Sequence, residues 1–153
     1  MQIRIEGFGL PGRSCPPGPG FPGYDDVHVA VQPRERDAQP LAPHPGDAGS
    51  ALWTLDCTAR RGAGGVDVTG TFVQGRPGQR FVYLAWSGVD GSGVRTVFRR
   101  AKLMLDAVDP STADAAADTG LLTARLALTD AHGRPLCAAV RPPAVTWSAG
   151  AAS

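Results

Sequence analysis

The sequence lacks the features of several protein classes. Its apolar runs are far shorter than the ~20 residues of a membrane-spanning helix. Residues 1–6 alternate apolar and polar side chains where a signal peptide would be continuously apolar. The three cysteines, Cys15, Cys57 and Cys137, are an odd number without short spacings, which argues against a disulfide framework and against a zinc site. We therefore expect a cytoplasmic protein with reduced cysteines, no membrane partner, no metal and no cofactor.

Lysine is nearly absent, because 14 arginines accompany the single Lys102. The net charge is only +1, which argues against nucleic acid as a partner, since such proteins carry a strong positive field. The charge is uneven, however. Residues 51–105 have eight basic and three acidic side chains, for +5, whereas residues 1–50 and 106–153 each carry −2. The middle third is therefore the basic part of the chain.

A length of 153 residues suits one domain, 1–153. Within it, residues 10–23 hold five prolines and four glycines, and residues 33–50 hold four more prolines. Proline lacks the backbone donor and glycine lacks a restrained backbone, so neither stretch suits a helix or a sheet interior. We expect two long loops there, of the kind that often cover a site.

Between these loops the apolar side chains recur with a period of two, as in half-buried strands. The expected strands cover residues 2–6, 26–32, 53–58, 66–72, 80–86, 94–98, 121–129, 136–140 and 145–147. Residues 80–86 are apolar on both faces, which is typical of a central strand covered on both sides. The pattern predicts a mainly β fold, either an antiparallel β-sandwich or a small, partly open barrel.

One short helix is expected at residues 110–119. Asp109 suits the N-cap position and Pro110 the first helical position, while Gly120 suits the C-terminal stop. Residues 99–108 fit either a strand or a helix, and we favour a strand because Leu103 and Leu105 alternate. A helix there would make the fold α+β.

Seven segments of the sequence carry a resemblance to a known family. They are 10–15 (LPGRSC), 27–29 (VHV), 73–78 (VQGRPG), 83–86 (YLAW), 98–103 (FRRAKL), 128–130 (LTD) and 136–143 (LCAAVRPP). With these, nearly the whole chain resembles an uncharacterised family of short actinobacterial proteins catalogued as a domain of unknown function. The resemblance implies a single domain and brings no activity with it.

Arginines beside glycines at turns, and others at strand ends, suggest a binding site. A guanidinium offers five donors in a planar fork that matches a carboxylate or a phosphate. Several such groups at one mouth of the β-structure, with aromatic walls and the 10–23 loop as a gate, would hold an anionic small molecule. The alternative is that they are solvated or pair with nearby aspartates. The candidate ligand-binding residues are Arg13, Arg76, Arg134, Arg99, Tyr83 and Trp86.

His28 is the candidate for proton transfer. It lies on the strand face opposite Val27, Val29 and Val31, and imidazole titrates near neutral pH. If that face lines a cavity, His28 would serve cofactor-free acid–base or cyclisation chemistry. If it faces solvent, the histidine is an ordinary surface residue. Spacing alone assigns it no partner carboxylate.

Two functions follow from these features. The first is binding of an anionic or polar small molecule in the arginine-lined pocket, with or without catalysis by His28. The second is a protein–protein interaction module or homodimeric structural protein without catalysis, in which an aromatic strand face or an edge strand contacts another chain.

Overall fold

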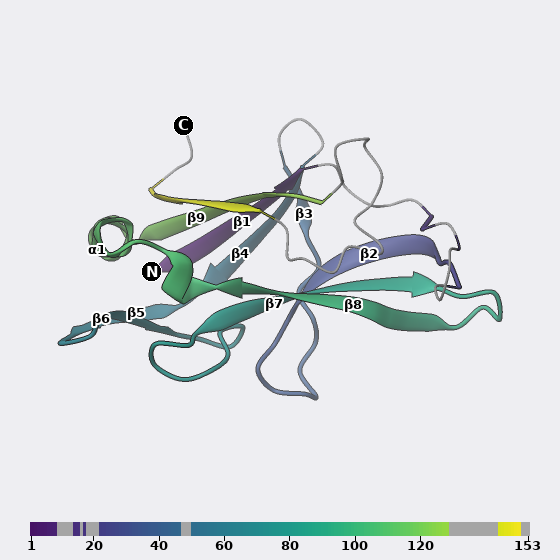
Figure 1. The fold of residues 1–153 in the computed structure, drawn as a ribbon, viewed down its shortest axis with the longest axis horizontal. Helices are drawn as coiled ribbons and strands as arrows, with labels where there is room; N and C mark the ends of the chain where they lie inside the picture. Colours follow the sequence, from purple (N-terminus) through teal and green to yellow (C-terminus); the bar gives the residue numbers. More distant parts are fainter. Residues whose placement is uncertain (9–13, 16, 18–21, 47–49, 129–143, 151–153) are drawn as a thin grey trace.

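Two β-sheets form the body of the computed structural model, which describes residues 1–8, 14–15, 17, 22–46, 50–128 and 144–150 (Figure 1). In this part of the chain, one sheet has the strand order β10-β9-β1-β4-β3 and the other has the order β2-β7-β8. A hairpin of β5 and β6 forms a third, two-stranded sheet. The strands are β1 (Gln2–Phe8), β2 (Asp25–Gln32), β3 (His44–Pro45), β4 (Ala51–Asp56), β5 (Thr58–Gly62), β6 (Gly65–Thr69), β7 (Phe81–Val89), β8 (Arg95–Met104), β9 (Leu121–Ala127) and β10 (Val145–Ala149).

The core lies between the two larger sheets, and alternation places it there. On β1, Ile3 and Ile5 are fully buried, whereas Gln2, on the opposite face of the strand, is exposed. Trp53 and Leu55 of β4 point to the same interior. Valines of β2 and the β7 side chains of Val82, Leu84 and Trp86 close it from the other sheet. The mainly β fold with one short helix is thus confirmed, and the described strands do not close into a barrel.

Strand β7 is the central strand of its sheet, as its apolar character predicts. Its two faces differ, however. Val82, Leu84 and Trp86 are buried in the core, whereas Phe81 and Tyr83 on the other face are only half-buried. Instead of a second apolar layer, the outer face of β7 has the cationic side chain of Lys102, from β8, over its Phe81 and Tyr83 rings.

The helix α1 (Pro110–Thr119) has the predicted bounds. The Asp109 side chain accepts a hydrogen bond from the Thr112 backbone N–H, and Gly120 ends the helix with φ +80°, a conformation that glycine adopts without strain. Before the helix, β8 continues to Met104 and is followed by the 3₁₀ turn η2 (Leu105–Ala107). The preference for a strand over residues 99–108 is therefore correct as far as Met104.

Two features of the sheets differ from the expected pattern. β1 pairs in parallel with β9 and antiparallel with β4, so the sandwich is not purely antiparallel. A parallel neighbour needs a crossover connection, and α1 supplies its last part. The second difference is β5, which the sequence did not predict, because its residues Thr58–Gly62 are mostly exposed and show no apolar alternation. The strand expected at residues 136–140 lies outside the described residues.

The cysteines also depart from expectation. Cys15 is buried and disulfide-bonded, whereas it was expected to be a reduced thiol. Cys57 is a free, half-buried cysteine between β4 and β5, and Cys137 lies outside the described residues. No helix in the described part of the chain is long and apolar enough to cross a membrane.

Candidate functional site

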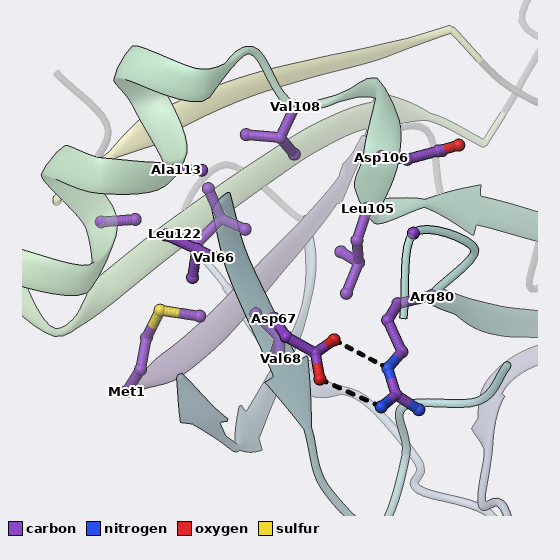
Figure 2. Close-up of a pocket in the computed structure, with 12 residues that line it drawn as sticks. Met1, Val66, Asp67, Val68, Arg80, Leu105, Asp106, Val108, Ala113 and Leu122 are labelled. Atoms are coloured by element: carbon purple, nitrogen blue, oxygen red, sulfur yellow. Dashed lines mark hydrogen bonds and ion pairs between the residues drawn. The ribbon is translucent and has the colours of Figure 1, made fainter. Parts of the chain in front are cut away.

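A small cavity lies where β6, β9, η2 and α1 meet, beside the first residue of the chain. Its volume is about 70 Å³, roughly twice the volume that a water molecule occupies in the liquid. Figure 2 shows aliphatic side chains from these separate elements turned toward one space. The lining residues are Met1, Val66, Asp67, Val68, Gly78, Arg80, Leu105, Asp106, Val108, Ala113, Ala116 and Leu122.

The cavity has one ion pair in its wall, between Asp67 of β6 and Arg80, which precedes β7. Arg80 donates to both oxygens of the Asp67 carboxylate, from Nε at 2.9 Å and from Nη2 at 3.1 Å (Figure 2). A third bond, from Nη1 to the Gly75 carbonyl at 2.6 Å, fixes the guanidinium plane. The hydrogen bond from Arg80 lowers the pKa of Asp67, and the nearby charge of Arg60 lowers it further. The carboxylate therefore stays ionised and oriented.

A wider groove of about 640 Å³ shares much of this lining and lies between the β5–β6 hairpin and α1. Its volume is within the usual range for small-molecule sites. Arg61 of β5 crosses from the hairpin to the helix, with Nη2 2.6 Å from Asp118 Oδ1 and 3.0 Å from the Asp114 carbonyl oxygen. Arg60, next to it, has no ion-pair partner within 4 Å among the described residues. Arg61 thus links the hairpin to the helix along one side of the groove. The Arg60 guanidinium beside it is available to a ligand.

His28 lies in a second polar group, on the outer face of the β2-β7-β8 sheet. Its Nε2 is 3.0 Å from Asp26 Oδ1, and Arg95 Nη2 is 2.6 Å from Asp26 Oδ2. Asp26 is the one non-glycine residue with positive φ in the described chain, at +50°, where a bulge in β2 turns it. Ser87 lies opposite His28 in the register but accepts from Arg95. This group is well exposed, and no cavity encloses it.

The sequence matches one known protein family. The family of unknown function DUF5990 matches residues 1–150. The chain belongs to this family. No curated protein and no solved structure matches the chain, so membership of DUF5990 brings neither an activity nor site residues.

The ligand-binding residues predicted from the sequence of this DUF5990 protein do not lie together in the structure. Arg99 lies over the buried Trp86 ring, with Cζ 4.5 Å from its centre. Arg76 is in the turn before β7 and donates to Gln79. Five strand residues separate the start of β7 from Trp86, about 17 Å at 3.3 Å per residue, so Arg76 and Arg99 do not share one pocket. Arg13 and Arg134 lie outside the described residues.

Tyr83 and Lys102 form a third group, on the outer face near Phe81. The Lys102 ammonium is 4.4 Å from the centre of the Phe81 ring and 5.6 Å from that of Tyr83. Trp86 points the other way, into the core, so Tyr83 and Trp86 are not walls of the same site. Tyr83 and His28 share the outer face of this sheet, four register positions apart along β7 and β2.

Sequence reasoning missed the residues of the cavity and groove. Arg80 and Asp67 are 13 residues apart, and Arg61 and Asp118 are 57 apart, so no local spacing reveals either pair. Residues 7–12 have the Gly-x-Gly-x-x-Gly spacing of dinucleotide-binding loops. Such a loop leads into a helix, whereas Cys15 forms a β-bridge with Tyr24. No group of three or more potential metal-ligating side chains lies together among the described residues.

Proposed function

We propose that this DUF5990 protein binds a small molecule with a short apolar end and a carboxylate group, in the cavity and groove between β6, η2 and α1. The observation that carries the proposal is the shape of the site: an apolar cavity of about 70 Å³ adjoining a groove of about 640 Å³. The apolar end fits among Val66, Val108 and Leu122. The polar remainder lies in the groove, where charged side chains are available.

The charges beside Asp67 support a carboxylate rather than a cation as the polar group of the ligand. Asp67 is neutralised by its hydrogen bonds from Arg80, and Arg60 is the register partner of Asp67 on β5. At this end of the groove two cations therefore share one carboxylate, whereas the side chains that line the cavity and groove as a whole, with Asp106 and Asp114, have no net charge. Figure 2 shows the Asp106 carboxyl turned away from this pair. An anionic group in the groove would meet Arg60 without displacing an existing ion pair.

The proposal is for binding, without a catalytic step. His28 is not among the residues that line the cavity or the groove. Its neighbour across the sheet, Ser87, is seven residues along β7 from Arg80, about 23 Å at 3.3 Å per residue. Acid–base chemistry by His28 would therefore act at another place. A cytoplasmic location stays a prediction, and the disulfide at Cys15 weighs against it.

Filling the cavity tests the proposal. Ala113 of α1 lines both the cavity and the groove, whereas Ala115 on the same helix is exposed. Ala113→Leu should fill the space, and Ala115→Leu is the matched control. We would measure binding of isovalerate and of isoamyl alcohol by protein-observed NMR. We expect isovalerate to bind the wild type and the control alike, more tightly than the alcohol, and Ala113→Leu to weaken it about tenfold or more.

Two results would contradict the proposal. Equal binding of isovalerate by Ala113→Leu and Ala115→Leu would place the ligand elsewhere. Shifts confined to the residues around His28 and Tyr83 would move the site to the outer face of the other sheet. Loss of binding in Arg60→Gln with Ala115→Leu unaffected would support the role of Arg60 in holding the carboxylate.

A second candidate function, a protein–protein interaction module, is favoured by a different observation. β8 is an outer strand of its sheet in the described chain and is paired with β7 alone. A strand of this length with one open side is a ready template for another chain.

A further inference from the structure

Strand β8 has an open side and an unusual composition. It runs ten residues, Arg95–Met104, which is long for an edge strand. Among the described residues its only strand partner is β7, so every second backbone N–H and C=O faces away from the sheet. Natural edges are usually short or covered. This one is neither in the described structure.

The charge of β8 is of one sign. It contains Arg95, Arg99, Arg100 and Lys102 and no acidic residue. Arg95 pairs with Asp26, and Arg99 is turned inward over Trp86. The other two project from the outer face and have no carboxylate within 4 Å among the described residues. Arg100 donates to the Gln32 amide oxygen at 3.2 Å, and Lys102 lies over two aromatic rings. Both charged groups thus lie over β7 and β2 in the absence of a partner, and neither charge is neutralised by a carboxylate there.

Exposed apolar side chains accompany these charges. Val94 is 56% exposed and Val97 is 38% exposed, and they are the exposed large apolar residues of the described chain. Val94 directly precedes β8. Val97 is the third residue of the strand and lies on the outer face, where its register partner is Ser87. The preceding turn is fixed by Asp90, whose carboxylate accepts from the Ser92 and Val94 backbone N–H groups. The edge is therefore ordered before any partner arrives.

We propose that β8 binds an extended, acidic segment of a partner protein, which adds to the sheet as a further strand. Backbone groups of the segment would pair with the open side of β8, as in strand addition to other sheet edges. Arg100 and Lys102 are two residues apart on one face. When their long side chains turn from β7 and β2 toward the added strand, they would match acidic side chains at positions i and i+2 of the segment. A valine or threonine a few positions away would cover Val97.

Charge complementarity selects this partner over a second copy of the chain. Two antiparallel β8 strands paired edge to edge would bring together the unneutralised Arg100 and Lys102 of each copy, four cationic side chains in all, and like charges on adjacent strands are destabilising. Single-stranded nucleic acid would need free aromatic faces for base stacking. Lys102 already covers the rings of Phe81 and Tyr83, so this surface favours carboxylates on a peptide.

The test uses a fluorescein-labelled decapeptide in which glutamate and threonine alternate, with one central valine. Binding to the full chain is measured by fluorescence anisotropy at low salt. The variant Arg100→Gln/Lys102→Gln removes both charges. Arg36→Gln is the control, because it removes a charge at an exposed position outside β8. We expect the affinity to fall about tenfold in the double variant and to stay unchanged in the control. Added salt should weaken wild-type binding.

A second pair of probes separates strand addition from simple charge attraction. The same decapeptide methylated on every backbone nitrogen keeps its carboxylates but cannot form a β-ladder. We expect it not to bind. Equal binding of the methylated peptide, or equal affinity of the double variant and the wild type, would overturn the proposal. Tighter binding of a 12-nucleotide oligothymidylate than of the peptide would also overturn it. So would a dimer of the wild type that becomes more stable when both charges are removed in the double variant. If the double variant is misfolded by circular dichroism, Lys102→Gln alone replaces it.

Discussion

The Arg80 guanidinium holds both carboxylate oxygens of Asp67 and the carbonyl oxygen of Gly75 at once. It thereby joins three separate segments: β6, the turn of residues 74–79, and the chain entering β7. The side chains are largely shielded from water, with 18% of Arg80 and 33% of Asp67 exposed. This contact therefore fixes one wall of the cavity and the turn beside it.

Replacing Arg80 by methionine should destabilise the protein by about 1–2 kcal/mol at pH 7, because a partly buried carboxylate loses its charged donors. The measurement is urea unfolding followed by circular dichroism. Arg76→Met in the adjacent turn is the control, because Arg76 is exposed and contacts only Gln79 through its side chain. A cost below the scatter of surface substitutions, about 0.5 kcal/mol, would contradict the structural role.

The same pair predicts acid sensitivity. The pKa of Asp67 is lowered from its usual 3.8 in the folded protein, chiefly by the Arg80 hydrogen bond. The stabilisation is therefore complete above pH 3.8 and is lost as the pH falls through the lower, folded value. We expect the difference in unfolding free energy between the wild type and Arg80→Met to shrink as pH falls below 4. A difference that is constant down to pH 2 would rule out this coupling.

The Asp109 carboxylate should likewise stabilise the protein near neutral pH and lose this effect in acid. Its carboxylate accepts from the Ser111 hydroxyl at 2.6 Å and from the Thr112 hydroxyl and N–H at 2.7 and 3.0 Å. These bonds lower the pKa of Asp109 to about 2. Asp109→Ala should lower the thermal midpoint at pH 7, and Asp109→Asn should lower it less, because asparagine also caps helices. As the pH falls from 3.8 to 2 the wild type should lose its advantage over Asp109→Asn.

The turn that carries the Gly75 carbonyl depends on glycine. Gly75 has φ +86°, and a Cβ there would collide with the Gln79 carbonyl oxygen. Gly75→Ala should therefore cost about 1–3 kcal/mol in urea unfolding. Gly64 in the β5–β6 turn offers the matched control, since it has ordinary φ and nothing lies within 4 Å of the added methyl group. Similar costs for the two substitutions would show that the turn adapts.

The cysteines should react unequally. Burial raises the pKa of the Cys57 thiol to about 11, so at pH 8 only ~0.1% is the reactive thiolate. Native protein should therefore label slowly with an aromatic disulfide reagent. After denaturation without reductant, mass spectrometry of the alkylated chain should show Cys57 labelled and Cys15 protected, because Cys15 is disulfide-bonded. Labelling of Cys15 under those conditions would contradict the bond.

The local signals of the sequence were good guides to single elements. Asp109, Pro110 and Gly120 predicted the bounds of α1, because capping is a matter of a few adjacent residues. Alternating Ile3 and Ile5 predicted β1 and its buried face. β5 was missed because its side chains are mostly exposed, so they carry no apolar rhythm to detect.

The candidate site was much less predictable. His28 was a proposed proton carrier, and its partner Asp26 is only two residues away, yet the contact depends on the bulge in β2 that gives Asp26 its positive φ. The residues around the cavity come from the consecutive elements η2, α1 and β9 and from β6, which is distant from them in the sequence. The predicted arginines did not meet: Arg76 lies in the turn before β7, whereas Arg99 lies over Trp86, the sixth residue of β7.

The sequence by itself determined the strands with a buried face and the helix with its caps, though not β3 or β5, because alternation and capping are settled within a few residues of chain. The tertiary structure alone decided that β1 lies parallel to β9, that Arg80 meets Asp67, and that β8 is left at an edge. Those outcomes depend on which strands become neighbours when the apolar faces are buried together. One alternating pattern is compatible with many neighbours, so only the packing of the whole chain selects among them.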